Sequence, residues 1–370
     1  MKKLFSLLLA LAMVMSLAAC STSAGGGNES EGSAAPVSEE PVGGAGGEEP
    51  TEVTVNGVDA NGEPTEVTIP YKPERVVVLD LANLDILDNL GLGDRVVGVP
   101  TVTLPYLEPY NDKADIVVSV KTPDMEAVMA CEPDLILMGG RMAEYYDELN
   151  QIAVTLRLTT VSDDGLVEAI RANAKTIGAI FGETEQVDNL LAQYDARIAT
   201  LAEFAEGKTC VLGMSTSGSF NLLGNDGRCS LIVNEIGFDN IGAESATTGS
   251  SRGGESGRGG RGSGEAVTNE VGSEANDTSG STPTHGNEVS FEAVVKLNPE
   301  YIFVMDRDSA ISATGAQMAS EIMENELIMK TDAYQNGNLV ILENPGIWYL
   351  AEGGITALDV MLKDLETALL

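Results

Sequence analysis

Arg141 and Arg307 occupy equivalent places in two similar segments of this 370-residue chain. Each follows a short apolar run, residues 135–138 and residues 301–305, whose length suits a buried parallel strand. Open α/β sheets bind ligands at the carboxyl ends of their strands, and a guanidinium group offers several fixed donors to anionic oxygen atoms. A single arginine in such a place is more commonly part of a surface ion pair. Because the spacing is repeated, we expect both arginines to point into one cleft.

The two arginines end a longer repeat, formed by residues 123–141 and residues 289–307. The copies lie 166 residues apart (292 − 126), which is too long for the period of a solenoid. In each copy, helix-forming residues lead to a proline, which ends a helix because it lacks an N–H group. The repeat therefore predicts two similar lobes that face a common cleft. The identical pairs are Glu126 with Glu292, Ala127 with Ala293, Val128 with Val294, Pro133 with Pro299 and Arg141 with Arg307.

The order of apolar segments predicts an α/β fold with two Rossmann-like lobes, each a mainly parallel sheet with flanking helices. The lobes are expected over residues 51–183 and 207–370, with the ligand cleft between them. A long, rigid connecting helix over residues 184–206, about 33 Å in length, is expected to join them. The other predicted elements are a hairpin over 53–69 with its turn at Asn61-Gly62, a strand over 75–80, and helices over 81–90, 166–181 and 354–370.

The first 50 residues predict export and attachment to a membrane. Two lysines precede an apolar stretch, which is the layout of a cleaved signal peptide over residues 1–19. The sequence L-A-A-C at 17–20 resembles the bacterial lipobox, so Cys20 is expected to become the lipidated first residue. Lipid on Cys20 would hold the protein on the outer face of the cytoplasmic membrane. Residues 20–50 are rich in Gly, Ser, Ala, Pro and Glu and predict a disordered tether.

The composition limits the classes of partner. The formal net charge is −36, and it becomes −38 (−36 − 2) without the two lysines of residues 1–19. Such an acidic chain is not expected to bind nucleic acid. The cysteines beyond Cys20 show no C-x-x-C spacing, which argues against a zinc site or a disulfide framework, and Cys210 lies in an apolar run typical of a strand core. These cysteines are Cys131, Cys210 and Cys229.

A Gly/Ser-rich stretch over residues 243–284 interrupts the second lobe. It has no Leu, Ile, Met or aromatic residue, so it cannot bury enough apolar area to offset the entropy of ordering, and we expect it to be disordered. Its three arginines could form an anion-binding arm over the cleft, but a tolerated surface insertion is the simpler interpretation. These arginines are Arg252, Arg258 and Arg261.

Three motifs are PERVVVLD at residues 73–80, LGLGDRVVGVP at 90–100 and EPDLILMGGRMAEYYDEL at 132–149. Together they resemble the solute-binding lipoproteins of bacterial ABC importers for iron siderophores and cobalamin, the class III periplasmic binding proteins. The resemblance runs from residue 51 to residue 370, apart from the insertion. Within that family the chain is most similar to the catecholate siderophore binders. The closer similarity rests on GGR ending at Arg141, GRCSLIVNEIGF at 227–238, THG at 284–286, VMDR ending at Arg307 and WYLAEGG at 348–354.

The resemblance implies a ligand site for an anionic ferric catecholate. Arg141, Arg228 and Arg307 would form a basic triad around the ligand. His285 and Tyr349 would coordinate the iron directly, at positions that a siderophore with only four oxygen atoms leaves open. Taken alone, a histidine after such an insertion is commonly a solvated loop residue, and a tyrosine beside a tryptophan commonly packs in the core.

The resemblance also implies the protein's partners. Glu126 and Glu292 would dock into arginine pockets on the permease of an ABC transporter, and charge pairs of this kind set orientation and association rate. The alternative is that each carboxylate only stabilises the start of its helix through the helix dipole. The chain is expected to be a monomer without a permanently bound cofactor, and its ligand a ferric siderophore, an Fe³⁺ chelate.

The other functional classes fit less well. An enzyme is not expected, because GMSTS at residues 213–217 lacks the G-x-S-x-G elbow and GKT at 207–209 precedes a strand and lacks the first glycine of a P-loop. A lipoprotein that binds haem or another iron chelate on the same scaffold is the nearer alternative, since tyrosine and histidine both ligate haem iron. Three cleft arginines favour a compact polyanion over that macrocycle. A structural adhesin would explain the anchor but not the paired Glu and Arg positions.

Overall fold

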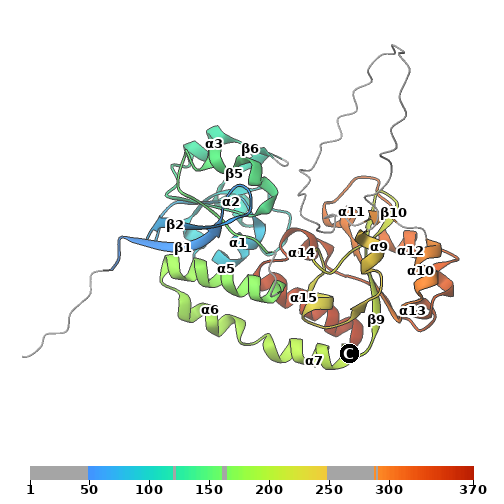
Figure 1. The fold of residues 1–370 in the computed structure, drawn as a ribbon. Helices are drawn as coiled ribbons and strands as arrows, with labels where there is room; N and C mark the ends of the chain where they lie inside the picture. Colours follow the sequence, from blue (N-terminus) through green and yellow to red (C-terminus); the bar gives the residue numbers. More distant parts are fainter. Residues whose placement is uncertain (1–48, 120–121, 161–164, 248–286, 289–290) are drawn as a thin grey trace, which may run out of the picture. The chain divides into compact units, whose positions relative to one another are not determined.

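The described part of the computed structural model begins with a β-hairpin (Figure 1), in which β1 (Glu52–Val58) pairs antiparallel with β2 (Pro64–Pro70). The turn contains Gly62 with a φ of 88°, a left-handed conformation that glycine adopts without steric cost. The predicted hairpin and its turn are therefore confirmed. The structure describes residues 49–119, 122–160, 165–247, 287–288 and 291–370.

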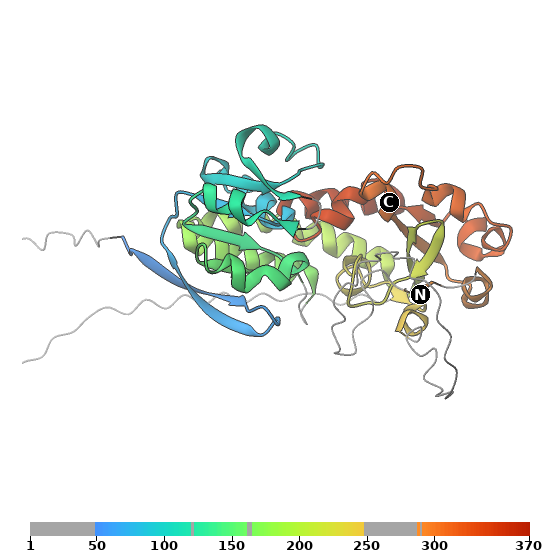
Figure 2. The same cartoon turned by 90° about the horizontal axis from the view of Figure 1, so that it is seen from above.

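The hairpin extends an eight-stranded sheet. Its other strands are β3 (Val76–Val78), β4 (Val96–Pro100), β5 (Asp115–Ser119), β6 (Thr122–Pro123), β7 (Leu135–Met138) and β8 (Thr155–Arg157). The order is β2-β1-β8-β7-β3-β4-β5-β6, and the strands from β8 to β5 run parallel. β3 and β7 are buried at every residue, as expected of central strands covered on both faces. Figure 2 shows the β1–β2 ribbon extending from this sheet.

Helices connect these strands. They are α1 (Leu81–Asn89), η1 (Gly93–Arg95), α2 (Tyr110–Lys113), α3 (Met125–Ala130), η2 (Gly140–Tyr145), α4 (Tyr146–Leu149) and α5 (Leu166–Phe181). Asp80 caps α1, because its carboxylate accepts a hydrogen bond from the Asn83 N–H at 3.0 Å. α5 ends where Gly182 adopts a φ of 80°, a common helix stop. The helices predicted over residues 81–90 and 166–181 are confirmed.

The second sheet contains β9 (Thr209–Thr216), β10 (Ser219–Leu222), β11 (Asp239–Asn240), β12 (Asn287–Glu288), β13 (Tyr301–Asp306) and β14 (Leu339–Ile341). The order is β12-β10-β9-β13-β14, with β11 beside β9. β9 pairs parallel with β11 and β13, and β13 pairs parallel with β14, whereas β10 pairs antiparallel with both of its neighbours. The α/β architecture with two sheets is confirmed. The helices around this sheet are α8 (Leu231–Asn234), α9 (Ala243–Thr247), α10 (Phe291–Leu297), α11 (Arg307–Ala310), α12 (Ala319–Met323), η4 (Ile328–Lys330), α13 (Asp332–Gln335), α14 (Pro345–Leu350) and α15 (Ile355–Leu369).

The two copies of the sequence repeat fold alike. α3 and α10 are each followed by a residue in the left-handed region, Glu132 and Asn298, both with a φ of 45°. A proline comes next, and then a fully buried strand, β7 or β13. The predicted order of helix, proline and strand is confirmed. The helix ends earlier than the proline requires, at the turn that contains the left-handed residue.

The predicted insertion over residues 243–284 begins later than expected. Its first five residues form α9, and Ala246 is fully buried in the core cluster that contains Val211, Phe220 and Leu222. The prediction of disorder is therefore wrong for residues 243–247, because one small apolar side chain packs against the second sheet. Residues 248–284 lie outside the described residues.

The predicted connecting helix over residues 184–206 is two helices, α6 (Thr184–Leu191) and α7 (Asp195–Ala205). The Tyr194 N–H donates to the Leu191 carbonyl at 3.2 Å, three residues back, so the chain makes a tighter turn than an α-helix there. The ring of Tyr194 is buried, and its hydroxyl donates to the Ile355 carbonyl at 3.4 Å. We attribute the break to this packing, and the prediction of one continuous helix is wrong.

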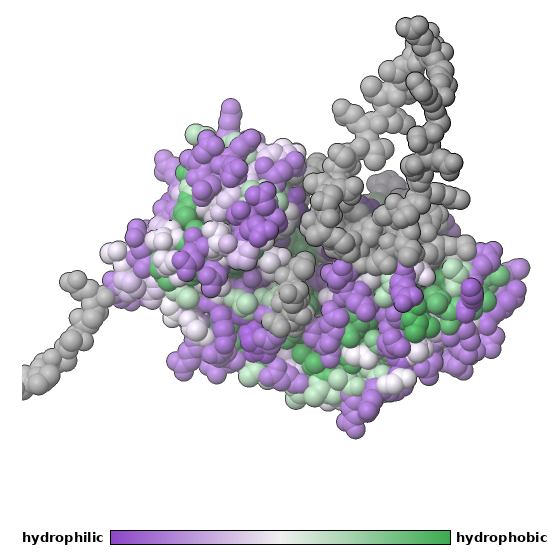
Figure 3. All heavy atoms as spheres, viewed as in Figure 1, coloured by the Kyte–Doolittle hydropathy of each residue, from purple (hydrophilic) through white to green (hydrophobic). Residues whose placement is uncertain are grey.

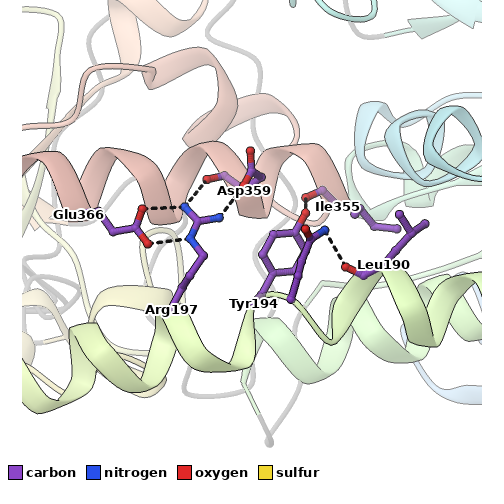
Figure 4. A network of polar contacts seen from close by, with 7 residues as sticks. Leu190, Tyr194, Arg197, Ile355, Asp359 and Glu366 are labelled. Atoms are coloured by element: carbon purple, nitrogen blue, oxygen red, sulfur yellow. Dashed lines mark hydrogen bonds and ion pairs between the residues drawn. The ribbon is translucent and has the colours of Figure 1, made fainter.

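The C-terminal helix α15 (Ile355–Leu369) confirms the helix predicted over residues 354–370. Charged side chains connect it to α7 (Figure 4). Arg197 donates to both carboxylate oxygens of Glu366, at 2.6 and 2.9 Å, and forms a second ion pair with Asp359. A two-pronged arginine–carboxylate pair also restricts orientation. These contacts fix the register of the two helices.

α15 is also held by a residue from α1. Asp85 is completely buried, and its carboxylate accepts from the N–H groups of Thr356 and Ala357 at 3.0 and 2.9 Å. These N–H groups belong to the first turn of α15, where a helix has no carbonyl partners of its own. Asn89 and the Tyr106 hydroxyl also donate to this carboxylate, at 2.6 and 2.9 Å. One aspartate of the first half of the chain therefore caps the last helix of the second half.

Hydrophilic residues cover much of the left part of the face drawn in Figure 3, and hydrophobic residues are visible toward its lower right. Within the described ranges, no helix combines the length and the apolar character needed to cross a membrane. The thiols of Cys131, Cys210 and Cys229 are free and buried, and Cys210 lies in β9, which confirms its place in a strand core.

Candidate ligand-binding site

Three arginines surround Tyr349. Arg141 and Arg228 both donate to its backbone carbonyl, at 2.7 and 2.8 Å, while Arg307 donates to its hydroxyl at 3.1 Å. The guanidinium carbons of Arg141, Arg228 and Arg307 lie 5.1, 4.0 and 5.6 Å from the centre of its ring, within the range of a cation–π interaction. The structure thus brings the three predicted arginines and the predicted tyrosine into one cluster.

The topology of the two sheets places the arginines. Arg141 is the third residue after β7 and the second residue of η2, and Arg307 begins α11 directly after β13. Both therefore lie at the carboxyl ends of central parallel strands, where the repeat predicted them. Arg228 comes from the segment before α8 and has a side chain that is only 14% exposed. The first sheet therefore positions Arg141, the second sheet positions Arg307, and the segment before α8 supplies Arg228.

Tyr349 is held by the anchoring of its helix, α14. The neighbouring Trp348 is completely buried, and its indole N–H donates to Asp364 at 3.0 Å. Asn344, which precedes the helix, donates to the same carboxylate through its side chain at 2.6 Å. Tyr349 itself is 7% exposed. Asp364 on α15 thus fixes the start of α14, and with it the position of the tyrosine among the arginines.

Carboxylates accompany the arginines. A Glu352 oxygen lies 4.0 Å from Arg228, and an Asp308 oxygen lies 3.5 Å from Arg307. Asp308 also accepts from the Ser217 N–H at 2.6 Å, which links α11 to the end of β9. The cluster is therefore partly neutralised by the protein's own acids, and the three guanidinium charges do not act alone.

Two of the neighbouring carboxylates are perturbed by burial. Burial raises the pKa of Glu352 to about 7, while the positive charge of Arg228 opposes the rise. Burial also raises the pKa of Asp80, opposed by the Asn83 N–H and by the charge of Arg141. Both acids favour their neutral forms more than exposed carboxylates do, and protonation of Glu352 makes the local charge of the site more positive as the pH falls below about 7.

The cluster offers what an anion with several oxygen atoms in a plane requires. Guanidinium groups supply directed N–H donors and flat faces, and an aromatic ring lies among them. Bidentate hydrogen bonds to charged oxygen atoms are the strong ones in proteins, so an oxyanion can compete with the Tyr349 carbonyl for Arg141 and Arg228. The site can therefore bind a compact polyanion; no nucleophile and base pair is required for that role.

Other predicted functional residues are only partly placed. Glu126 and Glu292 are exposed in the first turns of α3 and α10, at equivalent points of the two repeats. His285 and Cys20 lie outside the described residues. Among the residues that are described, no group of three or more His, Cys, Asp or Glu side chains is arranged to hold a metal ion. Tyr349 is the one predicted iron ligand that the structure locates.

Sequence reasoning missed the acids that support the cluster, namely Glu352, Asp308 and Asp364. Glu352 lies within WYLAEGG and Asp308 directly follows VMDR, so both stand inside or beside motifs that already suggested a site. Asp364 had no such signal, because it lies 15 residues beyond Tyr349 in a helix (364 − 349). Its proximity to Trp348 depends on how α14 folds back on α15.

A family model described as "Periplasmic binding protein" matches residues 76–345. The petrobactin-binding protein YclQ of Bacillus subtilis is 32% identical over 316 residues, covering 84% of this chain and 86% of its own. Its crystal structure superposes with a TM-score of 0.69 at 31% identity, over 86% of this chain and 98% of that one.

Two further relatives come from Vibrio species. The ferric-anguibactin-binding protein FatB of Vibrio anguillarum is 26% identical over 310 residues, covering 81% of this chain and 84% of its own. The crystal structure of the periplasmic catecholate-siderophore binding protein VctP of Vibrio cholerae superposes with a TM-score of 0.68 at 28% identity, over 85% of this chain and 100% of that one. Each of these similarities covers more than four fifths of this chain.

Proposed function

Since this chain belongs to the periplasmic binding protein family, we propose that it captures a ferric catecholate-type siderophore outside the cytoplasm and delivers it to the permease of an ABC transporter. The relatives described above are named for binding petrobactin, ferric anguibactin or a catecholate siderophore. A binding protein of this family performs no chemical reaction on its ligand, so the proposed role requires no catalytic residues.

The observation that carries the proposal is the convergence of Arg141, Arg228 and Arg307 on Tyr349. A ferric catecholate carries negative charge on oxygen atoms held in flat rings, which matches directed guanidinium donors and an aromatic face. In the bound state, the ligand oxygens would replace the Tyr349 carbonyl as acceptors. Tyr349, together with His285, would then reach iron positions left open by a siderophore with four oxygen atoms.

The test is a fluorescence titration of the full-length protein in a mild detergent. Trp348 is buried beside Tyr349, so an iron complex in the site should quench its emission. The probes are a ferric bis-catecholate, a ferric hydroxamate and haemin. Saturable quenching by the catecholate at low concentration, with much weaker responses to the other two, is the expected result. Saturation by haemin or by the hydroxamate alone would overturn the proposed ligand class.

Membrane attachment is part of the proposed role. We propose that the signal peptide over residues 1–19 is removed, that Cys20 carries the lipid, and that residues 20–50 tether the binding unit to the outer face of the membrane. Residues 49–370 form one compact unit, which is consistent with a single binding body at the end of a tether. The protein would act as a monomer with no permanently bound cofactor.

Reversing the charge of the docking glutamates should strongly reduce delivery and leave capture intact. In the double variant Glu126→Arg, Glu292→Arg, we expect iron uptake by whole cells from a ferric bis-catecholate to fall by about tenfold or more. The reason is that both carboxylates are exposed at equivalent points and would meet arginines of the permease. The affinity of the purified variant for the same complex should remain within about twofold, since α3 and α10 contribute no residue to the arginine cluster.

The matched control for that experiment is Glu148→Arg, Glu321→Arg, which changes the net charge equally at two other exposed positions. Uptake by this control should be close to that of the native protein. If both double variants lose uptake to the same degree, net charge rather than docking is responsible, and the role assigned to Glu126 and Glu292 is wrong.

A further inference from the structure

Glu352 lies next to Arg228 of the arginine cluster and contacts this part of the chain in two ways. The residue follows α14, and its side chain is 13% exposed. One carboxylate oxygen accepts from the Cys229 N–H at 2.8 Å, and the other lies 4.0 Å from the guanidinium of Arg228. A single carboxylate therefore holds both the backbone next to Arg228 and the end of its side chain.

The backbone that Glu352 holds is unusual. Cys229 has a φ of 63°, in the left-handed region that residues other than glycine seldom adopt. The hydrogen bond from its N–H to Glu352 stabilises this turn, and the turn determines the direction in which Arg228 leaves the backbone. The Nε atom of Arg228 is buried and finds no hydrogen-bond acceptor among the described residues. One N–H donor of the Arg228 guanidinium is therefore buried without an acceptor among the described residues.

The charge of Glu352 matters as much as its position. An ionised Glu352 offsets one guanidinium charge inside a site that contains Arg141, Arg228 and Arg307. The attraction between the site and a ligand scales with the product of their charges, so a change in the charge of the site acts more strongly on a more highly charged ligand. The carboxylate therefore affects how the site ranks ferric complexes of different charge.

We propose that Glu352 is a specificity-determining residue, which positions Arg228 and, by offsetting its charge, tunes the site toward ferric catecholates of low negative charge. This inference rests on the proposed function, because it assumes that ferric catecholates are the ligands. It goes further by assigning the choice among them to a residue outside the group that contacts the ligand.

The surroundings of Glu352 define its charge state. Burial and the charge of Glu235 raise the pKa of Glu352 to about 7, whereas Arg228, the Cys229 N–H and Arg141 favour its ionised form. Burial also raises the pKa of the neighbouring Cys229 thiol well above its ordinary value, so this thiol stays neutral. Glu352 therefore changes its charge between about pH 6 and about pH 8.5, and burial raises the pKa of the facing carboxylate of Glu235 as well.

The experiment compares two probes that differ in charge. A ferric bis-catecholate carries one negative charge and a ferric tris-catecholate carries three. Their Kd values are measured at about pH 8.5 with the full-length native protein in detergent and with Glu352→Gln. The quantity of interest is the ratio of the two Kd values, because a general distortion of the site weakens both probes and leaves the ratio unchanged. We expect the ratio to shift about tenfold toward the triply charged probe in Glu352→Gln.

Two further variants separate charge from shape. Glu352→Asp retains the charge with a shorter side chain, so the native ratio should be kept even if both affinities fall. Glu66→Gln removes one exposed carboxylate from the edge strand β2 and should leave the ratio unchanged. At about pH 6 the difference in ratio between the native protein and Glu352→Gln should shrink, because the native carboxylate is then largely neutral.

The outcomes are distinguishable. If the native protein binds both probes and Glu352→Gln shows the native ratio at about pH 8.5, the inference is overturned and the proposed function stands. A shift that Glu66→Gln reproduces would likewise assign the effect to net charge and overturn it. If the native protein binds neither probe, the proposed function fails, and the inference fails with it.

Discussion

Replacing Arg307 by alanine is expected to weaken binding of a ferric bis-catecholate by about a hundredfold. Arg307 donates to the Tyr349 hydroxyl at 3.1 Å and lies 3.5 Å from Asp308, with a side chain only 21% exposed. Truncation removes a directed charge from the site and leaves the Asp308 carboxylate without its arginine. Both effects oppose an anionic ligand. Fluorescence titration of Arg307→Ala against the native protein measures the loss.

Arg307→Lys separates charge from geometry. Lysine keeps the positive charge but lacks the planar fork of donors, so an intermediate loss of about tenfold is expected. Arg95→Ala is the control, since Arg95 is 40% exposed and pairs only at 4.0 Å with Glu74. Circular dichroism should show the same fold in all three variants. If Arg307→Ala binds as well as Arg95→Ala, the arginine cluster is not the ligand site.

The second large effect is on stability. Replacing Asp85 by alanine is expected to lower the free energy of unfolding by about 3 to 4 kcal/mol near neutral pH. The substitution removes the cap from the first turn of α15 and leaves buried donors on Thr356, Ala357 and Tyr106 without their acceptor. It also opens a cavity where the backbone of Gly354 approaches, since a Cβ on that glycine would lie 2.0 Å from the Asp85 carboxylate. Urea unfolding measures the change.

The pH dependence of this effect has a defined sign. Burial raises the pKa of Asp85 to about 6, above the value of about 3.9 expected for the unfolded chain. The folded state therefore binds the proton more tightly, and the stability contributed by Asp85 falls as the pH rises from about 4 to about 6, by about 3 kcal/mol over the whole window. The difference in stability between the native protein and Asp85→Ala should accordingly increase when the pH is lowered from about 7 to about 4.

Asp88→Ala is the matched control for Asp85→Ala. Asp88 belongs to the same helix and is exposed, and its carboxylate accepts a hydrogen bond from the Tyr110 hydroxyl at 2.8 Å. Its loss should cost about 1 kcal/mol or less. Equal losses of unfolding free energy in the two variants would show that the Asp85 contact between α1 and α15 stabilises the fold no more than an exposed hydrogen bond does. A difference that narrows at low pH would contradict the sign derived for Asp85.

Local patterns predicted many elements correctly because each element's cause lies within a few residues of it. The hairpin follows from alternation and Asn61-Gly62, and α5 follows from apolar spacing that ends at Gly182. The connecting segment was predicted less well. Its helical pattern is continuous in the sequence, but burial of the Tyr194 ring against α15 introduces a turn that the neighbouring residues do not predict. The first residues of the insertion, including Ala246, are helical for the same kind of reason.

Local patterns were sufficient to predict the α/β class, the duplicated segments, and the placement of Arg141 and Arg307 at the ends of strands, because helix stops and apolar runs of fixed length are local properties. Which side chains meet depends on long-range packing. Tyr349 lies between arginines up to 208 residues away, Glu352 reaches a residue 123 positions earlier, and Asp85 caps a helix 271 residues later. Contacts at such separations depend on how the two sheets and α15 pack, and packing is a property of the whole chain, which no short segment of sequence contains.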